Sequence, residues 1–451
     1  MASAAEQLVS NMNFGVLAKA SELKQRIFFA LGALIVFRLG IFIPLPGLDP
    51  AVIADIFSTK VAGGVLGMFN MFTGGALERF SIFTLGIMPY ISASIIIQLM
   101  TLVSKDLANL KKEGEMGRKR LNQYMRWLTL LLAALQALGV AYGLESMQGA
   151  NGNSAVLSTG LFFRITTVVT LTGGSMFVLW LAEQITARGV GNGSSLIIFA
   201  GIVAGLPGAI GTILDMGHTQ ALSVFAILLV GLMVVGVIAF IVFMERAQRR
   251  LVVQYPKRQQ GNKMYGGESS HLPIKLNSAN VIPAIFASSL LLLPATWQGF
   301  MSSTDSPEWL QTLATWLQSG HPVFMGLYAS LIIFFTFFYT AIVFNPEETA
   351  DNLKKYGGFI PGIRPGKNTA DYIDHVLTRL TLVGALYLAA VCLLPELMRS
   401  QIPGMPFYLG GTGLLIVVSV TIDTVGQIHS HLLAHQYEGL IKKAKLRGRR
   451  G

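Results

Sequence analysis

The chain has 451 residues, of which 52% are hydrophobic and only 13% are charged. Soluble domains carry about a quarter charged residues, so this composition excludes an ordinary soluble protein and indicates a membrane protein. The net charge of +11 would also suit a nucleic-acid-binding protein, but the distribution of the charges along the chain argues against that class. The single cysteine, Cys392, lies in an apolar stretch and excludes a disulfide framework.

Apolar stretches long enough to cross a bilayer recur along the chain, since a membrane-spanning helix needs about 20 such residues. We expect ten spans, at roughly 27–43, 82–103, 127–144, 161–181, 194–213, 222–244, 281–300, 323–344, 376–397 and 407–428. The spans should be helices, because isolated strands leave their backbone groups unsatisfied in lipid. The predicted fold class is therefore an all-α, polytopic membrane protein.

The first apolar stretch is followed by Pro44-Leu45-Pro46-Gly47 rather than by a cleavage site of small residues. A cleavable secretory signal normally ends in such small residues. We therefore expect the first span to remain in the membrane.

Basic residues concentrate in every second gap between the spans. The N-terminus, the tail, and the gaps at 105–126, 245–276, 345–375 and near Arg188 hold 28 of the 34 lysines and arginines. Basic loops stay in the cytoplasm, so both ends of the chain are predicted to be cytoplasmic. Membrane topology alone would explain this pattern. A docking surface for an anionic partner is the second interpretation.

Ten spans divide into two sets of five. Because five is odd, a duplicated five-helix unit would insert its second copy upside down, and inverted repeats place the working site between the halves. The expected organisation is a cytoplasmic N-terminus (1–26), an N-terminal half (27–213), a C-terminal half (222–428) and a basic tail (429–451).

The apolar segment Val65–Thr73 is too short to cross the bilayer and lies between Gly63-Gly64 and Gly74-Gly75. Nine helical residues rise only about 14 Å. The segment either lies flat at the interface or re-enters the membrane from outside, where it would line or close a cavity.

Two of the predicted cytoplasmic loops are long and structured. Residues 245–280 suggest an extended hairpin with a polar tip at Gln259–Lys263, and residues 345–375 contain the turn-rich run Pro361–Gly366, which holds Arg364. Ordered, basic loops that project from one side suggest that a large partner docks there.

Motifs for catalysis are weak. Residues 362–368 superficially resemble a phosphate loop, but the spacing is one residue short and Asn368 replaces the required Ser or Thr. His431 and His435 could share a metal, although histidines at a helix end more often face water or headgroups. We therefore expect no enzymatic activity and no cofactor.

Charge inside the spans is scarce, with Arg38 in the first span, Arg379 near the start of the ninth and Asp423 near the inner end of the tenth. Ion-coupled transporters usually place acidic or histidine relays near the bilayer midplane. The scarcity of such relays weighs against a transporter, so an inverted-repeat secondary transporter for a small solute is the alternative function and not the main one. A non-conducting assembly scaffold is a third class, which would leave Val65–Thr73 without a role.

Long sequence runs cover almost the whole chain and share one family likeness. They are Phe37–Asp49, Phe69–Phe83, Gly86–Leu99 (GIMPYISASIIIQL), Ala182–Pro207, Glu245–Gly261, His271–Ser289, Phe337–Gly366 and Thr378–Glu396. These runs resemble the SecY family of bacterial protein-conducting channels. The resemblance implies an hourglass channel with an apolar ring at its waist, at Ile87, Ile91, Ile198, Ile285 and Ile416. Such a constriction would exclude water and ions without holding a passing chain.

The resemblance also implies a plug and a lateral gate. The plug would be Val65–Thr73, with Val65, Met68, Phe69, Asn70, Met71 and Phe72 as its main residues. The gate would lie between the second and seventh spans, with polar candidates that could equally be ordinary packing residues: Ser92, Ser94, Asn280, Ser288 and Ser289.

The implied function is passive translocation of unfolded preproteins across the bacterial plasma membrane, with release of transmembrane segments sideways into lipid. The implied partners are SecE, a SecG-like small subunit, the SecA ATPase, the ribosome, the preprotein with its signal sequence, and membrane lipid. The partner contacts would be Arg249, Arg250, Lys257, Arg258 and Arg364. The hairpin tip at Asn262–Met264 is less basic than is common in the family.

Overall fold

The computed structural model describes residues 21–56, 65–146, 153–219, 223–255, 258–260, 263–265, 269–300, 316, 321–401 and 410–447. Most of these residues are helical, and short strands occur only between α11 and α12 within the described part. The helices are α3 (Ser21–Gly40), α4 (Pro50–Ile56), α5 (Val65–Thr73), α6 (Met88–Val103), α7 (Lys105–Lys112), α8 (Glu115–Ser146), α9 (Leu161–Arg188), α10 (Gly193–His218), α11 (Val224–Arg246), α12 (Ile282–Phe300), α14 (Pro322–Val343), α15 (Pro346–Lys355), α16 (Lys367–Gln401) and α17 (Gly411–Arg447). The strands are β1 (Gln248–Gln254), β2 (Arg258–Gln260), β3 (Lys263–Tyr265) and β4 (Ser269–Lys275).

The predicted helical membrane fold is confirmed. Seven helices of the described part are long and apolar enough to cross a membrane, or eight if the bent pair α6–α7 counts as one span. A helix also covers most of the two remaining predicted spans. Of these, α3 carries charges at both ends, including Glu22 and Arg38. Within α12, the stretch Ile282–Leu291 is a shorter apolar helix.

The second span is shorter than the sequence predicted. It begins at Met88 rather than at residue 82, because residues 76–87 form turns in which Phe80 and Gly86 have positive φ angles of 42° and 54°. Pro89 then lies in the first turn of α6, where a missing N–H costs nothing. At its other end the chain is extended at Ser104, and α7 turns away by 102°.

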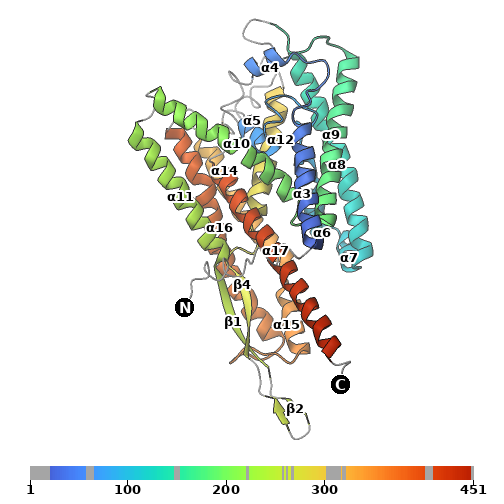
Figure 1. Cartoon of the computed structure of the whole chain (residues 1–451), viewed down its shortest axis with the longest axis vertical. Coiled ribbons are helices and arrows are strands. Elements are labelled where there is room, and N and C mark those ends of the chain that lie inside the picture. Colours follow the sequence, from blue (N-terminus) through green and yellow to red (C-terminus); the bar gives the residue numbers. More distant parts are fainter. Residues whose placement is uncertain are drawn as a thin grey trace. The chain divides into compact units, whose positions relative to one another are not determined.

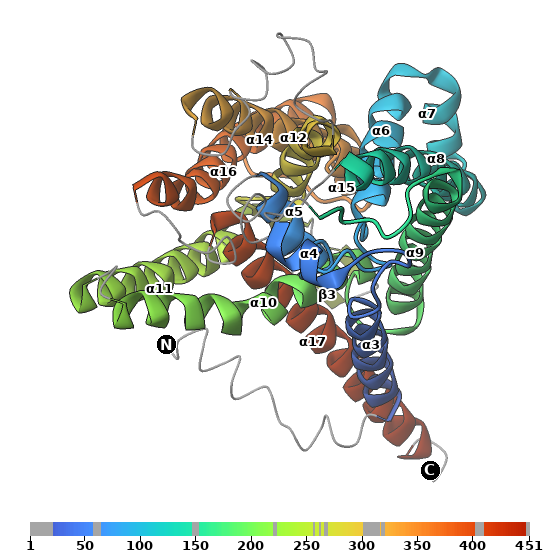
Figure 2. The ribbon, with the colours of Figure 1, turned by 90° about the horizontal axis from the view of Figure 1, so that it is seen from above.

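The described chain divides into two compact units. The first comprises the chain up to Gly208 and the part of α17 from Val420, and the second comprises most of the intervening chain. In the first unit, α8 packs against α6, α7 and α9, and α3 packs against α9 (Figures 1 and 2). This places both α6 and the bent helix α7 against the long helix α8.

In the second unit, α16 packs against α11, α14 and α15. The strand β1 pairs antiparallel with β4, with Arg249 opposite Ile274, and β2 pairs with β3 further along. The predicted extended hairpin is therefore confirmed. Figure 1 shows β1 and β4 running away from the end of α11. Gly261 and Asn262, at the predicted tip, lie outside the described residues.

Candidate functional site

The five residues of the predicted apolar ring are all buried, with exposed fractions between 0% and 6%. In the first unit, Ile87 caps the start of α6, and Ile91 follows one turn later on the same face. Ile198 lies on α10, whereas Ile285 and Ile416 belong to the second unit, on α12 and α17. That all five meet in one layer stays a prediction.

The short segment Val65–Thr73 forms the helix α5. Its residues Phe69–Phe72 are buried, while the side chains of Val65 and Met68 lie outside the described set. The end of the helix is held by local hydrogen bonds. The Thr73 hydroxyl donates to the carbonyl oxygens of Phe69 and Asn70, and the Asn70 side-chain oxygen accepts from the Glu78 amide at 3.0 Å. Its role as a plug stays a prediction.

The predicted gate residues have ordinary helix environments in several cases. The Ser288 hydroxyl donates to the Ile285 carbonyl one turn earlier, at 2.9 Å, and Ser92 and Ser289 are buried. Ser94 accepts a hydrogen bond from the Gln98 amide at 3.0 Å. The contact of Ser288 within its own helix agrees with the packing interpretation, whereas Ser94 and Gln98 form a short polar strip on α6.

The two long basic loops fold together into one body, here called the hairpin body (residues 248–255, 269–275 and 345–377). The backbones of Gln254 and Phe359 exchange two hydrogen bonds of 2.9 Å. A small apolar core lies beneath them, formed by Leu251, Ile274, Ile360, Ile373, Val376 and Leu377. Burial of apolar surface therefore fixes the loop that carries Arg364 to the strands that carry Arg249 and Arg250.

The basic side chains of the hairpin body point outward where they are described. Arg249 and Arg250 on β1 are exposed, and so is Arg364. The turn around Arg364 is restricted by Pro361 and Pro365, because the proline ring fixes φ. Gly362 and Gly366 adopt positive φ angles, and the Thr369 hydroxyl donates a hydrogen bond to the Arg364 carbonyl. Lys257 and the side chain of Arg258 lie outside the described residues.

A buried carboxylate at the base of the hairpin was not predicted. Glu245, at the end of α11, accepts a hydrogen bond of 2.8 Å from the Asn277 amide, which also donates to the Asn280 carbonyl at 3.0 Å. Both side chains are buried. Since Asn277 follows β4 and Asn280 precedes α12, this pair joins the hairpin to a predicted gate helix. The signal in the sequence was an acidic residue at the end of an apolar span.

We expect Asn277→Leu to lower the free energy of unfolding by about 1–3 kcal/mol. The change removes both hydrogen bonds that the Asn277 amide donates and places an apolar side chain against the buried Glu245 carboxylate. The measurement is thermal unfolding in detergent, together with protease cleavage at the hairpin. The matched control is Ser278→Ala, which removes an exposed hydrogen bond to the Lys275 carbonyl. Equal stability of the two variants would show that the buried pair does not fix the hairpin base.

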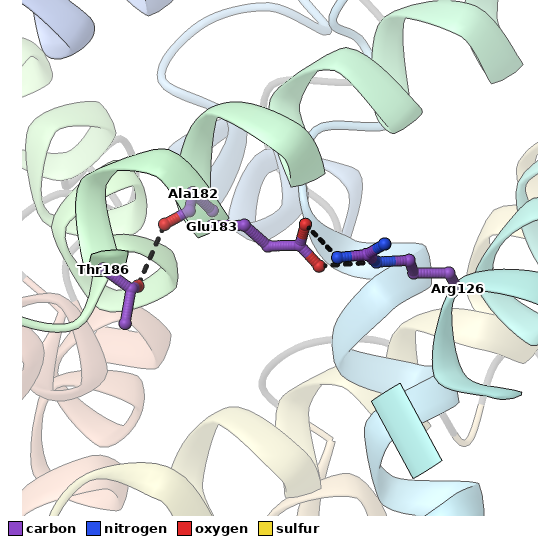
Figure 3. Close-up of polar contacts among 4 residues, drawn as sticks. All are labelled: Arg126, Ala182, Glu183 and Thr186. Carbon is purple, nitrogen blue, oxygen red and sulfur yellow. Dashed lines mark hydrogen bonds and ion pairs between the residues drawn. The ribbon is translucent and has the colours of Figure 1, made fainter. Parts of the chain in front are cut away.

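An ion pair joins α8 to α9 in the first unit (Figure 3). Arg126 meets the Glu183 carboxylate in a bidentate arrangement, with nitrogen–oxygen distances of 2.9 and 2.7 Å. One turn along α9, the Thr186 hydroxyl donates to the Ala182 carbonyl and accepts from the Gly193 amide at the start of α10. These contacts join α8 to the C-terminal part of α9, and that part of α9 to the start of α10. Hydropathy gives no signal for such pairs, because the partners lie 57 residues apart.

Comparison with known proteins agrees with the motifs. The family model described as SecY matches residues 81–425. The chain is also 56% identical over 427 residues to protein translocase subunit SecY of Escherichia coli (strain K12), covering 95% of this chain and 96% of that protein. The chain belongs to the SecY family.

Other SecY relatives and solved structures extend the match. The SecY subunit of Vibrio cholerae is 54% identical over 431 residues, covering 95% of this chain and 96% of that protein; the SecY subunit of Rickettsia bellii is 53% identical over 437 residues, covering 97% and 100%. A structure described as a protein-conducting channel has a TM-score of 0.66 at 17% identity, and Sec61 in a canine ribosome–channel complex has 0.63 at 17%. Both cover 90% of this chain and 92% of theirs, and at this identity they show the fold alone. This SecY-family chain is thus a multi-pass membrane protein.

Proposed function

We propose that the chain is a passive protein-conducting channel, through which unfolded preproteins cross the membrane and from which transmembrane segments leave sideways into lipid. The observation that carries the proposal is the 56% identity, over 95% of the chain, to a protein translocase subunit. At such identity over nearly the whole length, the two chains share a fold. The likeness to solved channels supports the fold of this proposal.

In this proposal the apolar ring is the seal of the channel, and α5 is the plug on its outer side. An apolar constriction excludes water and ions without any charged filter, and it offers a passing chain no strong polar contact. The burial of Ile91 and Ile198 on two helices of the first unit fits such a ring. The gate between α6 and α12 would let apolar segments reach lipid.

The chain itself would have no enzymatic activity, so the energy must come from a partner. The proposed partners are an ATPase of the SecA type and the ribosome on the cytoplasmic side, and small subunits of the SecE and SecG types in the membrane. The exposed arginines of the hairpin body support this proposal. A planar guanidinium suits both carboxylates and the phosphates of ribosomal RNA. The location would be the bacterial plasma membrane, with both ends of the chain in the cytoplasm.

The proposal is tested by reconstituting the chain with its small subunits into vesicles and adding SecA, ATP and a radiolabelled preprotein. We expect protease-protected preprotein to accumulate only with ATP and with an intact signal sequence. Solute uptake driven by a proton gradient, without preprotein protection, would instead indicate a secondary transporter. Failure of both would contradict the channel proposal.

A further inference from the structure

The C-terminal end of α5 packs directly against the backbone of α10. Gly74, just after α5, has a positive φ of 71°, and a side-chain carbon added there would lie 2.8 Å from the Cα of Gly201. A carbon added at Gly201 would meet Gly74 at 3.1 Å and the Phe72 carbonyl at 3.2 Å. At Gly74 an added Cβ would force the two segments apart, and the positive φ also favours glycine there. At Gly201 an added Cβ would push the neighbouring backbone away by a few tenths of an ångström, and a larger side chain would push it further. The contact fixes where α5 ends.

A charged side chain reaches the same point from α3. Arg38 donates a hydrogen bond of 2.6 Å from its Nη1 atom to the Gly74 carbonyl oxygen, although the two residues are 36 positions apart. This carbonyl follows the last turn of α5, where the helix dipole leaves partial negative charge. A charge-assisted hydrogen bond is about twice as strong as a neutral one. Arg38 from α3 and Gly201 from α10 therefore both contact Gly74, and this contact site of Arg38, Gly74 and Gly201 is here called the seat of α5.

Two simpler roles for Arg38 account for less of this geometry. An arginine in the last turn of α3 stabilises its own helix dipole wherever its side chain points. An arginine near the end of a span also tends to extend toward water. The Arg38 guanidinium is part-buried instead, and it lies 5.5 Å from the centre of the Phe42 ring while bonded to Gly74. Arginine inside a membrane span is costly and usually marks a functional position.

We propose that Arg38 is a positioning residue that clamps the C-terminal end of α5 and so holds the channel closed at rest. This inference rests on the proposed channel function. Neutralising Arg38 should free α5 from one side of its seat, and the closed state should lose stability relative to the open one. The expected consequence is a gain of function. The channel leaks ions at rest and accepts preproteins whose signal sequences are too weak for the wild type.

The test compares two variants. Arg38→Met keeps much of the side-chain length but has no hydrogen-bond donor, whereas Arg38→Lys keeps a charged donor for the Gly74 carbonyl. For Arg38→Met we expect on the order of tenfold higher resting ion conductance in planar bilayers, and export of a preprotein with a defective signal. Arg38→Lys should stay close to wild type. The matched control is Arg79→Met, because Arg79 also lies over the Phe42 ring, at 4.6 Å, but is exposed. Wild-type conductance in Arg38→Met, or equal leak in Arg79→Met, would overturn the proposal.

A second pair of variants approaches the seat from the α10 side, so that the test survives poor folding of Arg38→Met. Gly201→Val should displace the end of α5 and give the same leak and relaxed signal requirement. Gly211→Val on the same helix, where an added carbon meets nothing within 4 Å, should not. Wild-type behaviour of Gly201→Val would contradict the seat. If the wild-type chain itself fails to translocate preprotein, the proposed function is wrong. If it translocates and the variants do not leak, only the clamp is wrong.

Discussion

Replacing Ile91 and Ile285 together with glycine is expected to raise the resting ion conductance of the channel by on the order of tenfold or more. Both side chains are buried, on α6 and α12. An apolar constriction stays dry only while bulky side chains fill it, so removing two of them should admit water and then ions. The measurement is single-channel recording of the purified complex in planar bilayers, without preprotein.

The matched control removes equally bulky residues from the exposed faces of the same helices. Ile96 is 37% exposed on α6, and Leu290 is 41% exposed on α12. The double variant Ile96→Gly with Leu290→Gly should keep the low conductance of the wild type, although it carries the same helix penalty of glycine. If both double variants conduct alike, the apolar ring is not the seal.

Reversal of Arg364 to glutamate is expected to reduce SecA-driven translocation at least tenfold, while the amount of folded protein in the membrane stays unchanged. The side chain is exposed on a turn that Pro361 and Pro365 restrict, so little backbone entropy is lost on binding. Losing a charge-assisted contact and placing a like charge against an acidic partner both oppose docking. The measurement is ATP-dependent preprotein protection in vesicles.

Reversal of Arg249 and Arg250 should weaken ribosome binding and flatten its salt dependence. Each lost phosphate contact lowers the slope of log K against log salt by about one unit, so we expect a change of about two. The control is Lys354→Glu combined with Lys355→Glu, a double reversal of equal charge at exposed positions of α15 in the same hairpin body. Co-sedimentation with ribosomes across a salt series gives the slopes. If the double lysine reversal acts as strongly as the arginine reversals, the loops respond to net charge alone.

Much of the fold was predictable because lipid leaves the backbone few options. Apolar length predicted the helices, and the polar tip at Gln259–Lys263 predicted the hairpin of β1 and β4. The glycine pair at 74–75 predicted the end of α5, because glycine interrupts helices and permits the positive φ that both residues adopt. The start of α6 was misplaced, since residues 82–87 are as apolar as a span, yet Gly86 and Pro89 set the first turn at Met88.

The polar contacts that fix the candidate site were not predictable, because each joins residues far apart in the chain. Arg38 was noted as a charge within a span, but nothing in its neighbours points to the Gly74 carbonyl. Likewise, Glu245 gives no sign of Asn277 and Arg126 gives no sign of Glu183. Such pairs depend on how helices pack, which hydropathy does not encode.

The most direct test of the central claim is a photo-crosslink from position 91 to a preprotein arrested during transport. A benzophenone amino acid replaces Ile91, and the substrate carries a folded domain that stops it part-way. If the chain is a protein-conducting channel with Ile91 at its waist, the arrested preprotein should crosslink to position 91 but not to a probe at the exposed Ile96. Efficient translocation without any crosslink at position 91, or with equal crosslinking at position 96, would contradict the account.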